Sequence, residues 1–181
     1  MNSGGSTTFT LIFTPGASGS RSASLSIASN DADENPFVIA LSGTGGTAQQ
    51  LLADAMAAAG LTGPDAQAGA APFNDGVFNL LKYAFNLNFS DPDRRTLTPG
   101  TGTAGLPVLR IVSGTMSFEF LRRKNSGLCY TPQQSADLSE ASWQAATGTT
   151  TVTSIDENWE RVDIRQSPGT ARFFRVSVTV P

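Results

Sequence analysis

The feature that most constrains the fold is the stretch 74–85, NDGVFNLLKYAF. Asp75 is placed to cap a helix over this stretch. Asn79, Lys82 and Asn86 then fall three and four residues apart and form one narrow polar stripe on an otherwise almost entirely apolar helix. A short helix with so little polar surface must be packed on most sides. We therefore expect it to be the most buried helix, with β segments assembled around it.

The composition favours β structure in an exported protein. Charged residues make up 15% of the 181 residues, against a usual fraction of about 25%, while Gly, Ser and Thr are abundant. This balance is typical of β-rich extracellular modules, whose turns need Gly and whose strands tolerate Thr. The net charge is -3 and the 12 Lys and Arg form no long run. We therefore expect no nucleic-acid partner.

Residues that are missing from the sequence exclude several chemistries. Histidine is absent, which removes Ser-His-Asp and Cys-His nucleophile systems and metal sites that contain His. The lone Cys129 permits no internal disulfide and fits a buried apolar position. No apolar run reaches the roughly 18 residues of a membrane span, so we expect no membrane insertion. The first ten residues contain no signal peptide, so we expect the export signal to belong to a longer parent chain.

Residues 1–46 predict an incomplete immunoglobulin-like β segment. Apolar residues alternate with polar ones over 8–13, 23–27 and 37–41, which predicts three strands. A free-standing sandwich needs roughly seven strands to bury a core. The segment therefore packs onto the rest of the chain or recruits a strand from a partner.

The runs FTLIFTP, LSIASND and NPFVIALSGTG in this segment resemble the closing half of the immunoglobulin-like repeats of Hydin-type and choice-of-anchor D proteins. The resemblance covers residues 7–45 and lacks the first half of the repeat. It implies that these strands end a sandwich.

Residues 47–93 predict a helical connector. Thr47 and Gln50 have the spacing of a capping box at the start of a helix. Gly60 supplies the C-terminal cap of the same helix. A loop rich in Ala, Gly and Pro spans 61–74, and the helix capped by Asp75 follows.

The stretch from residue 74 also resembles D-x-D-G-D-G-x-x-N-L-L-E-Y-A segments of exported bacterial proteins, which look like calcium loops. With Gly76 as the loop glycine, Ala71, Phe73 and Asp75 take the first three ligand positions. Only Asp75 can ligate a metal there. Lys82 falls at the twelfth position, where a calcium loop has a bidentate Glu. The ligand count therefore argues against calcium and for Asp75 as a helix cap.

Residues 94–181 predict a C-terminal antiparallel β-sandwich. Short strand-like runs are separated by turns at even spacing. The runs are 107–112, 115–122, 129–134, 143–146, 149–154, 161–165 and 173–180. Alternation places Phe118 and Phe120 on one face, with Glu119 and Leu121 on the other.

The motifs SFEFLRR, GLCYTPQQSADL and RFFRVSVT, together with NDGVFNLLKYAFNL, resemble the C-terminal modules of large exported proteins of environmental bacteria. The resemblance spans roughly residues 47–181. It implies a surface context and no catalytic role.

Two candidate sites stand beside simpler interpretations. Asp31, Asp33 and Glu34 share one tight loop, where carboxylates and backbone carbonyls can bind calcium; a solvated acidic turn is the simpler interpretation. Trp159 lies beside acidic residues and is the one aromatic that looks exposed enough to stack on a sugar. A glycosidase pair among the carboxylates around Trp159 is not expected, because they lie in a turn without an apolar cleft.

The sequence as a whole predicts a mostly β fold, with a partial immunoglobulin-like sandwich, a short helical pair and a C-terminal antiparallel β-sandwich. The function expected is that of a non-catalytic structural or adhesive module of an exported cell-surface or extracellular protein. Its open edge is expected to bind other protein chains by strand addition, giving oligomers or filaments. The alternative is a carbohydrate-binding module appended to a larger secreted enzyme. No cofactor is expected besides calcium at the acidic loop.

Overall fold

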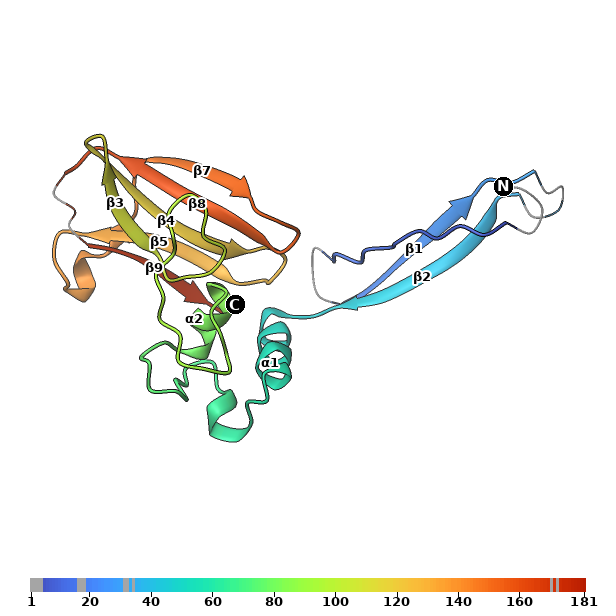
Figure 1. Cartoon of the computed structure of the whole chain (residues 1–181), viewed down its shortest axis with the longest axis horizontal. Coiled ribbons are helices and arrows are strands. Elements are labelled where there is room, and N and C mark those ends of the chain that lie inside the picture. The colour runs from blue at the N-terminus through green and yellow to red at the C-terminus, as the bar shows by residue number, and fades with distance from the viewer. Residues whose placement is uncertain (1–4, 16–18, 31–32, 34, 170, 172) are drawn as a thin grey trace. The chain divides into compact units, whose positions relative to one another are not determined.

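The computed structural model describes residues 5–15, 19–30, 33, 35–169, 171 and 173–181. The chain divides into two compact units, Met1–Gly46 and Thr47–Pro181. Within the described part, no helix combines the length and the apolar character needed to cross a membrane. The structure confirms the mostly β fold that the sequence predicts (Figure 1).

The N-terminal unit is built on an antiparallel hairpin of β1 (Gly19–Ile27) and β2 (Phe37–Gly45). Alternation along both strands makes the hairpin amphipathic. One face carries the four serines of β1. The other face carries the apolar side chains of Ala23, Leu25, Ile27, Phe37, Ile39 and Leu41.

The strand predicted over 8–13 is not formed, because these residues make no ladder with either strand of the hairpin. Their contact with the hairpin is made by side chains. The ring of Phe13 lies so close to Gly43 that a Cβ there would be 2.7 Å from it. Alternation in the sequence indicates a strand only where the segment pairs with an edge, and residues 8–13 contact the hairpin through side chains while both of its edges stay unpaired among the described residues.

The first helix, α1 (Ala48–Ala58), has the caps that the sequence predicts. The Thr47 hydroxyl accepts from the Gln50 N–H at 3.2 Å, and the Gln50 side chain accepts from the Thr47 N–H at 2.9 Å. At the other end Gly60 adopts a φ of 80°, and the N–H of Leu61 donates to the carbonyl of Met56. These bonds form a Schellman motif. A short 3-10 turn, η1 (Gly63–Ala66), follows.

The second helix, α2 (Asn79–Ala84), is shorter than expected and begins later. Its N-cap position is Phe78, whose side chain makes no capping bond, so the prediction that Asp75 caps this helix is wrong. Four of its six residues are buried, compared with three of eleven in α1. The prediction that this is the most buried helix is confirmed for the described residues.

The C-terminal unit contains two antiparallel sheets. One has the order β3-β4-β8-β7 and the other the order β6-β5-β9. The seven strands are β3 (Val108–Val112), β4 (Thr115–Arg123), β5 (Cys129–Ser135), β6 (Gln144–Ala145), β7 (Thr149–Ser154), β8 (Trp159–Gln166) and β9 (Phe173–Thr179). A 3-10 turn, η2 (Glu140–Ser142), precedes β6. Each strand lies within two residues of the run predicted for it.

The main core lies between the inner faces of the two sheets and α2. Phe118 and Phe120 of β4 pack there, as the alternation predicts, together with Val162 and Ile164 of β8. Partly buried side chains of β5 and β9 cover them, and Phe85 follows α2 into the same cluster. Leu121 points the other way, into a second small cluster.

Tyr130 of β5 joins α2 to the sheets through its hydroxyl group. The hydroxyl donates to the carbonyl of Ala84 at 3.0 Å and accepts from the N–H of Arg123 at 3.1 Å. Burial raises the pKa of Tyr130 to about 12, although the Arg123 N–H works against that shift. The hydroxyl therefore keeps its proton and its donor role at neutral pH.

Candidate functional site

The loop that resembles a calcium loop holds a buried ion pair instead of a metal ligand set. Lys82 Nζ lies 2.7 Å from Asp75 Oδ2, and the two side chains are 0% and 2% exposed. The ammonium also donates to the carbonyl of Asp91 at 3.0 Å and lies 4.7 Å from the centre of the Phe73 ring. Oxygen atoms and an aromatic face therefore surround a positive charge that the chain itself supplies.

Asp75 is bonded at both carboxylate oxygens. Oδ1 accepts from the N–H of Val77 at 3.0 Å, and Oδ2 accepts from the N–H of Asp93 at 2.8 Å. Burial alone would raise the pKa of Asp75, but the bond from Lys82 and these two N–H groups outweigh it and lower the pKa to about 2. Asp75 is thus a charged anchor that ties residues 75–77 to residue 93.

Asp93 extends this network. Its carboxylate accepts from the Arg95 guanidinium, with Nη2 to Oδ2 at 2.7 Å, and from the N–H of Asn88 at 2.8 Å. The bonds from Arg95 are the main reason that the pKa of Asp93 lies well below its usual range. The chain between α2 and β3 is therefore fixed by carboxylates that must stay ionised.

Two residues of the predicted polar stripe, Asn79 and Lys82, lie on α2 and are buried, while Asn86 lies beyond the end of the helix and is partly exposed. Asn79 is 0% exposed, and its side-chain N–H groups donate to the carbonyls of Asp65 at 2.7 Å and Gln67 at 2.9 Å. Phe78, next to it, is 51% exposed. The stripe thus holds the preceding loop against the helix. Sequence reasoning missed this role, because the acceptors are backbone carbonyls, which every residue has.

Trp159 is buried at 6% exposure, so the expectation that it is exposed to stack on a sugar is wrong. The centre of its ring lies 4.2 Å from the Arg123 guanidinium. The same guanidinium lies 4.1 Å from the centre of the Tyr83 ring. Arg123 Nε also donates to the carbonyl of Tyr83 at 3.1 Å. This stack of ring, cation and ring fastens α2 to β4 and β8. Leu97 and Leu121 join Trp159 in the same cluster.

The acidic loop proposed for calcium lies largely outside the described residues. Asp31 and Glu34 belong to the undescribed positions, and Asp33 is described. The calcium site of Asp31, Asp33 and Glu34 therefore stays a prediction. Elsewhere in the described chain, no group of three or more carboxylate, Cys or His side chains is placed to hold a metal ion.

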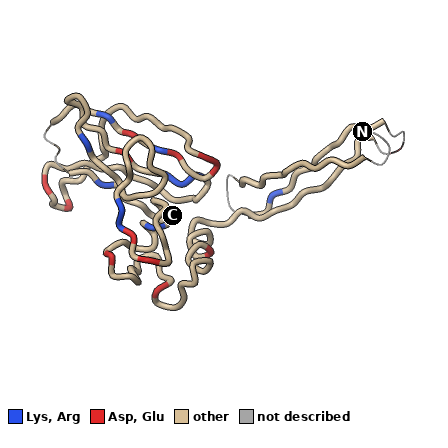
Figure 2. Tube along the Cα trace, in the orientation of Figure 1, with Lys and Arg blue, Asp and Glu red and all other residues tan. Residues whose placement is uncertain are grey.

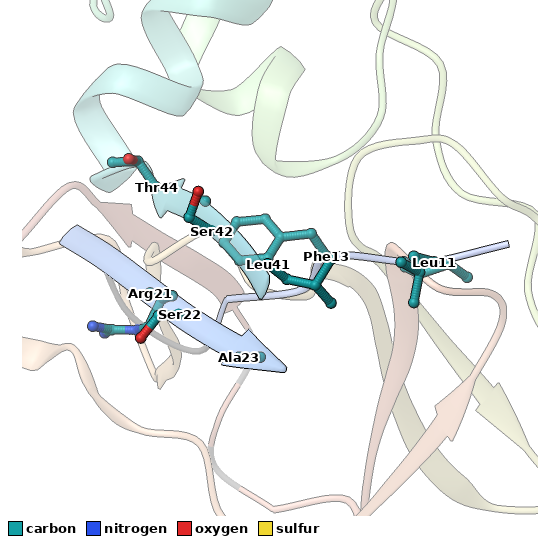
Figure 3. Close-up of a pocket in the computed structure, with 10 residues that line it drawn as sticks. Leu11, Phe13, Arg21, Ser22, Ala23, Leu41, Ser42 and Thr44 are labelled. Carbon is teal, nitrogen blue, oxygen red and sulfur yellow. The ribbon is translucent and has the colours of Figure 1, made fainter. Parts of the chain in front are cut away.

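An apolar hollow in the N-terminal unit lies between residues 11–13 and the hairpin (Figure 3). Its volume is about 420 Å³. Figure 3 shows Phe13 beside Leu41 of β2, with Ala23 of β1 below them. Serine and threonine side chains and Arg21 line the remaining wall. The floor of the groove is thus the apolar face of the hairpin.

The N-terminal unit leaves most of its apolar side chains exposed. The exposed fractions are Phe9 57%, Leu11 54%, Ile12 65%, Phe13 54%, Ile27 39%, Phe37 49% and Val38 55%. Gly45 alone is buried among the described residues of this unit. Exposed apolar side chains gathered in one small unit indicate an interaction surface.

Comparison of the chain with protein-family models, with curated proteins and with solved structures finds no match. Any inference about function therefore rests on the geometry of the two units.

Proposed function

We propose that this chain is a non-catalytic structural or adhesive module of an exported cell-surface or extracellular protein. In this proposal, the N-terminal unit binds the same unit of a second copy by strand addition. The observation that carries the proposal is the exposure of apolar side chains on a hairpin that buries almost nothing of its own. Two such hairpins offer each other both an apolar face and a free edge.

The edges of the hairpin support pairing with another strand. In the described residues, β1 pairs with β2 and with no further strand, so each strand keeps one unpaired edge. Sheet edges are usually protected by charges or by Pro. β2 contains neither, and Arg21 is the one charged residue of β1 (Figure 2). The hairpin thus lacks the features that normally prevent edge-to-edge association.

The partner proposed is a second copy of the chain. The surface of the N-terminal unit carries few charges, so two copies of it do not repel each other strongly. A non-identical partner is usually selected by complementary charge. The charged residues of 1–46 are Arg21, Asp31, Asp33 and Glu34, and the three acidic ones fall at positions 31–34 of the sequence, outside the residues of β1 and β2. Alternation places Arg21 at one end of the apolar face, so the rest of that face can meet an identical face without like charges opposite each other.

Light scattering on the full chain across a concentration series tests this proposal. We expect a mass above the 18.9 kDa of the single chain, rising with concentration. Phe37→Lys places a charge on the apolar face and should return the chain to a monomer. Ile111→Lys is the matched control, since Ile111 is a 70% exposed apolar residue of the C-terminal unit. A monomer at every concentration, or equal effects of the two variants, would overturn the proposal.

A further inference from the structure

A polar groove of about 340 Å³ lies on the outer face of the four-stranded sheet of the C-terminal unit. It is lined by Gly100, Arg110, Glu119, Thr151, Thr153, Arg161, Asp163 and Arg165. The register explains why they meet: Glu119 of β4 is opposite Asp163 of β8, which is opposite Thr151 of β7. Residues that are opposite across an antiparallel sheet share a face. This face is turned away from the core that Phe118 and Phe120 enter.

The two carboxylates of the groove are already occupied by bonds within the chain. Glu119, whose side chain is 2% exposed, accepts from the N–H of Gly100 at 2.8 Å and lies 3.0 Å from Arg161 Nε. Asp163 accepts from the hydroxyl of Ser117 and from Arg165 Nε, each at 2.7 Å. Their negative charge is thus neutralised inside the groove.

The three guanidinium groups, in contrast, have N–H donors that no acceptor of the groove occupies. Arg110 Nη2 lies 3.6 Å from Glu119 Oε2, which is too long for a hydrogen bond. Its Nε is buried and has no hydrogen-bond partner among the described residues. Arg161 Nη2 donates a hydrogen bond to the carbonyl of Gly102 at 2.6 Å. With three cations against two anions, the groove has a charge of +1 and an excess of N–H donors.

We propose that this groove binds a small oxyanion, a carboxylate or a sulfate group, with Arg110 as the main contact and Arg161 and Arg165 beside it. A planar guanidinium fork matches a carboxylate or a sulfate oxygen pair with two parallel N–H bonds. The volume lies at the lower end of the range for small-molecule sites, about 300–1,000 Å³. A ligand of the size of one acidic sugar therefore fits, and the hydroxyls of Thr151 and Thr153 line the wall beside its ring.

This site is independent of the strand addition proposed above, because every residue that lines it belongs to the C-terminal unit. A failure to assemble would leave the oxyanion site untouched. Failure to bind an oxyanion would likewise leave assembly untouched.

Isothermal titration calorimetry on the full chain at constant ionic strength tests the site. The probes are sodium D-glucuronate, a carboxylate sugar, and sodium sulfate, with glucose as the neutral analogue and chloride as the background anion. Glucuronate binding with weak or no sulfate binding identifies a carboxylate site, and the reverse identifies a sulfate site. Binding of neither anion, or of glucose as well as glucuronate, would overturn the proposal.

Arg110→Gln is the decisive variant, since it removes one ion pair, at 3.6 Å from Glu119, while Glu119 keeps its contacts with Arg161 and the Gly100 N–H. We expect at least about tenfold weaker binding, the usual effect of losing a charge-assisted bond. Arg122→Gln is the matched control: Arg122 lies on β4, the strand next to the one that carries Arg110, and its side chain is 41% exposed against 36% for Arg110, but it pairs with Glu160 outside the groove. It should bind like the unmodified chain. Equal weakening in both variants would overturn the proposal by indicating non-specific attraction.

Discussion

The two units of this chain place their apolar and charged side chains in opposite ways. The N-terminal unit holds apolar side chains in solvent, with Ile12 at 65% and Phe9 at 57% exposure. The unit of residues 47–181 buries charged ones, with Lys82 at 0% and Glu119 at 1% exposure. The first arrangement is unfavourable unless a partner covers it, and the second is unfavourable unless every charge is paired.

The two units also differ in whether their own chain supplies counter-ions for buried charges and cover for apolar side chains. The C-terminal unit satisfies its buried charges internally: Lys82 meets Asp75 and a carbonyl, and Glu119 meets Arg161 and an N–H group. The hairpin has no comparable internal solution among the described residues, since Ile27 and Phe37 on its apolar face stay 39% and 49% exposed. A unit that pairs its buried charges internally is expected to be rigid, and one that leaves its apolar side chains uncovered is expected to depend on association.

The largest effect is expected where the internal pairing is broken. Lys82→Met should lower the free energy of unfolding by about 3–5 kcal/mol, because it leaves the Asp75 carboxylate buried without its counter-ion. Urea unfolding of the full chain measures this change. Adding Asp75→Asn should recover part of the loss, because no unpaired charge remains.

Glu140→Gln is the control for that experiment. Glu140 is 90% exposed and its Oε2 lies 4.0 Å from Arg175, so its removal should change the free energy by less than about 0.5 kcal/mol. Similar losses for Lys82→Met and Glu140→Gln would contradict the interpretation that the buried pair fixes this loop.

Acid is the second way to break the pairing. Because the folded-state pKa of Asp75 is about 2, against about 3.9 in an unfolded chain, its ionisation stabilises the fold by about 2 kcal/mol above pH 4. That contribution is fully present above the unfolded pKa and is lost as the pH falls toward 2. Urea unfolding between pH 2 and 5 should show the loss, and Asp75→Asn should show a smaller one. An identical pH dependence of the two chains would contradict this assignment.

Regular patterns in the sequence predicted most of the C-terminal unit. Even turn spacing predicted all seven strands, and the spacing of Thr47, Gln50 and Gly60 predicted both ends of α1. Such signals are local, because the residues that bond to each other lie close in sequence. The strand over 8–13 was wrong for the opposite reason, since its pairing depends on an edge elsewhere.

The candidate sites were harder to predict because their partners are distant in sequence. Asp75 is of a residue type that often caps helices, yet its partners are Lys82 and the backbone of residue 93. Trp159 lies beside acidic residues in the sequence, but Arg123, 36 positions earlier, stacks against its ring and helps to bury it. The groove around Arg110 joins four strands and a turn, and the linear sequence does not reveal that contact.

A smaller effect is expected at the start of α1. Thr47→Ala removes the side chain that accepts from the Gln50 N–H, and should lower the free energy of unfolding by about 1 kcal/mol. Thr62→Ala is the matched control, because Thr62 occupies the N-cap of η1 without a side-chain capping bond. Urea unfolding should leave the Thr62 variant within about 0.5 kcal/mol of the unmodified chain. Equal losses would mean that the capping box does not stabilise the helix.

The smallest effect is expected in the segment that precedes the hairpin, and it tests the contrast between the units most directly. Ile12→Ala removes three carbon atoms from a side chain that is already 65% exposed, so the unfolding of a monomer should change by less than about 0.5 kcal/mol. Leu52→Ala, at 2% exposure in the C-terminal unit, should cost about 2–5 kcal/mol. Circular dichroism during urea unfolding, at concentrations where the chain is monomeric, measures both. A cost of about 2 kcal/mol or more for Ile12→Ala would mean that this side chain is packed within its own chain. The hairpin would then have an internal cover after all, and its apolar face would no longer require a second copy.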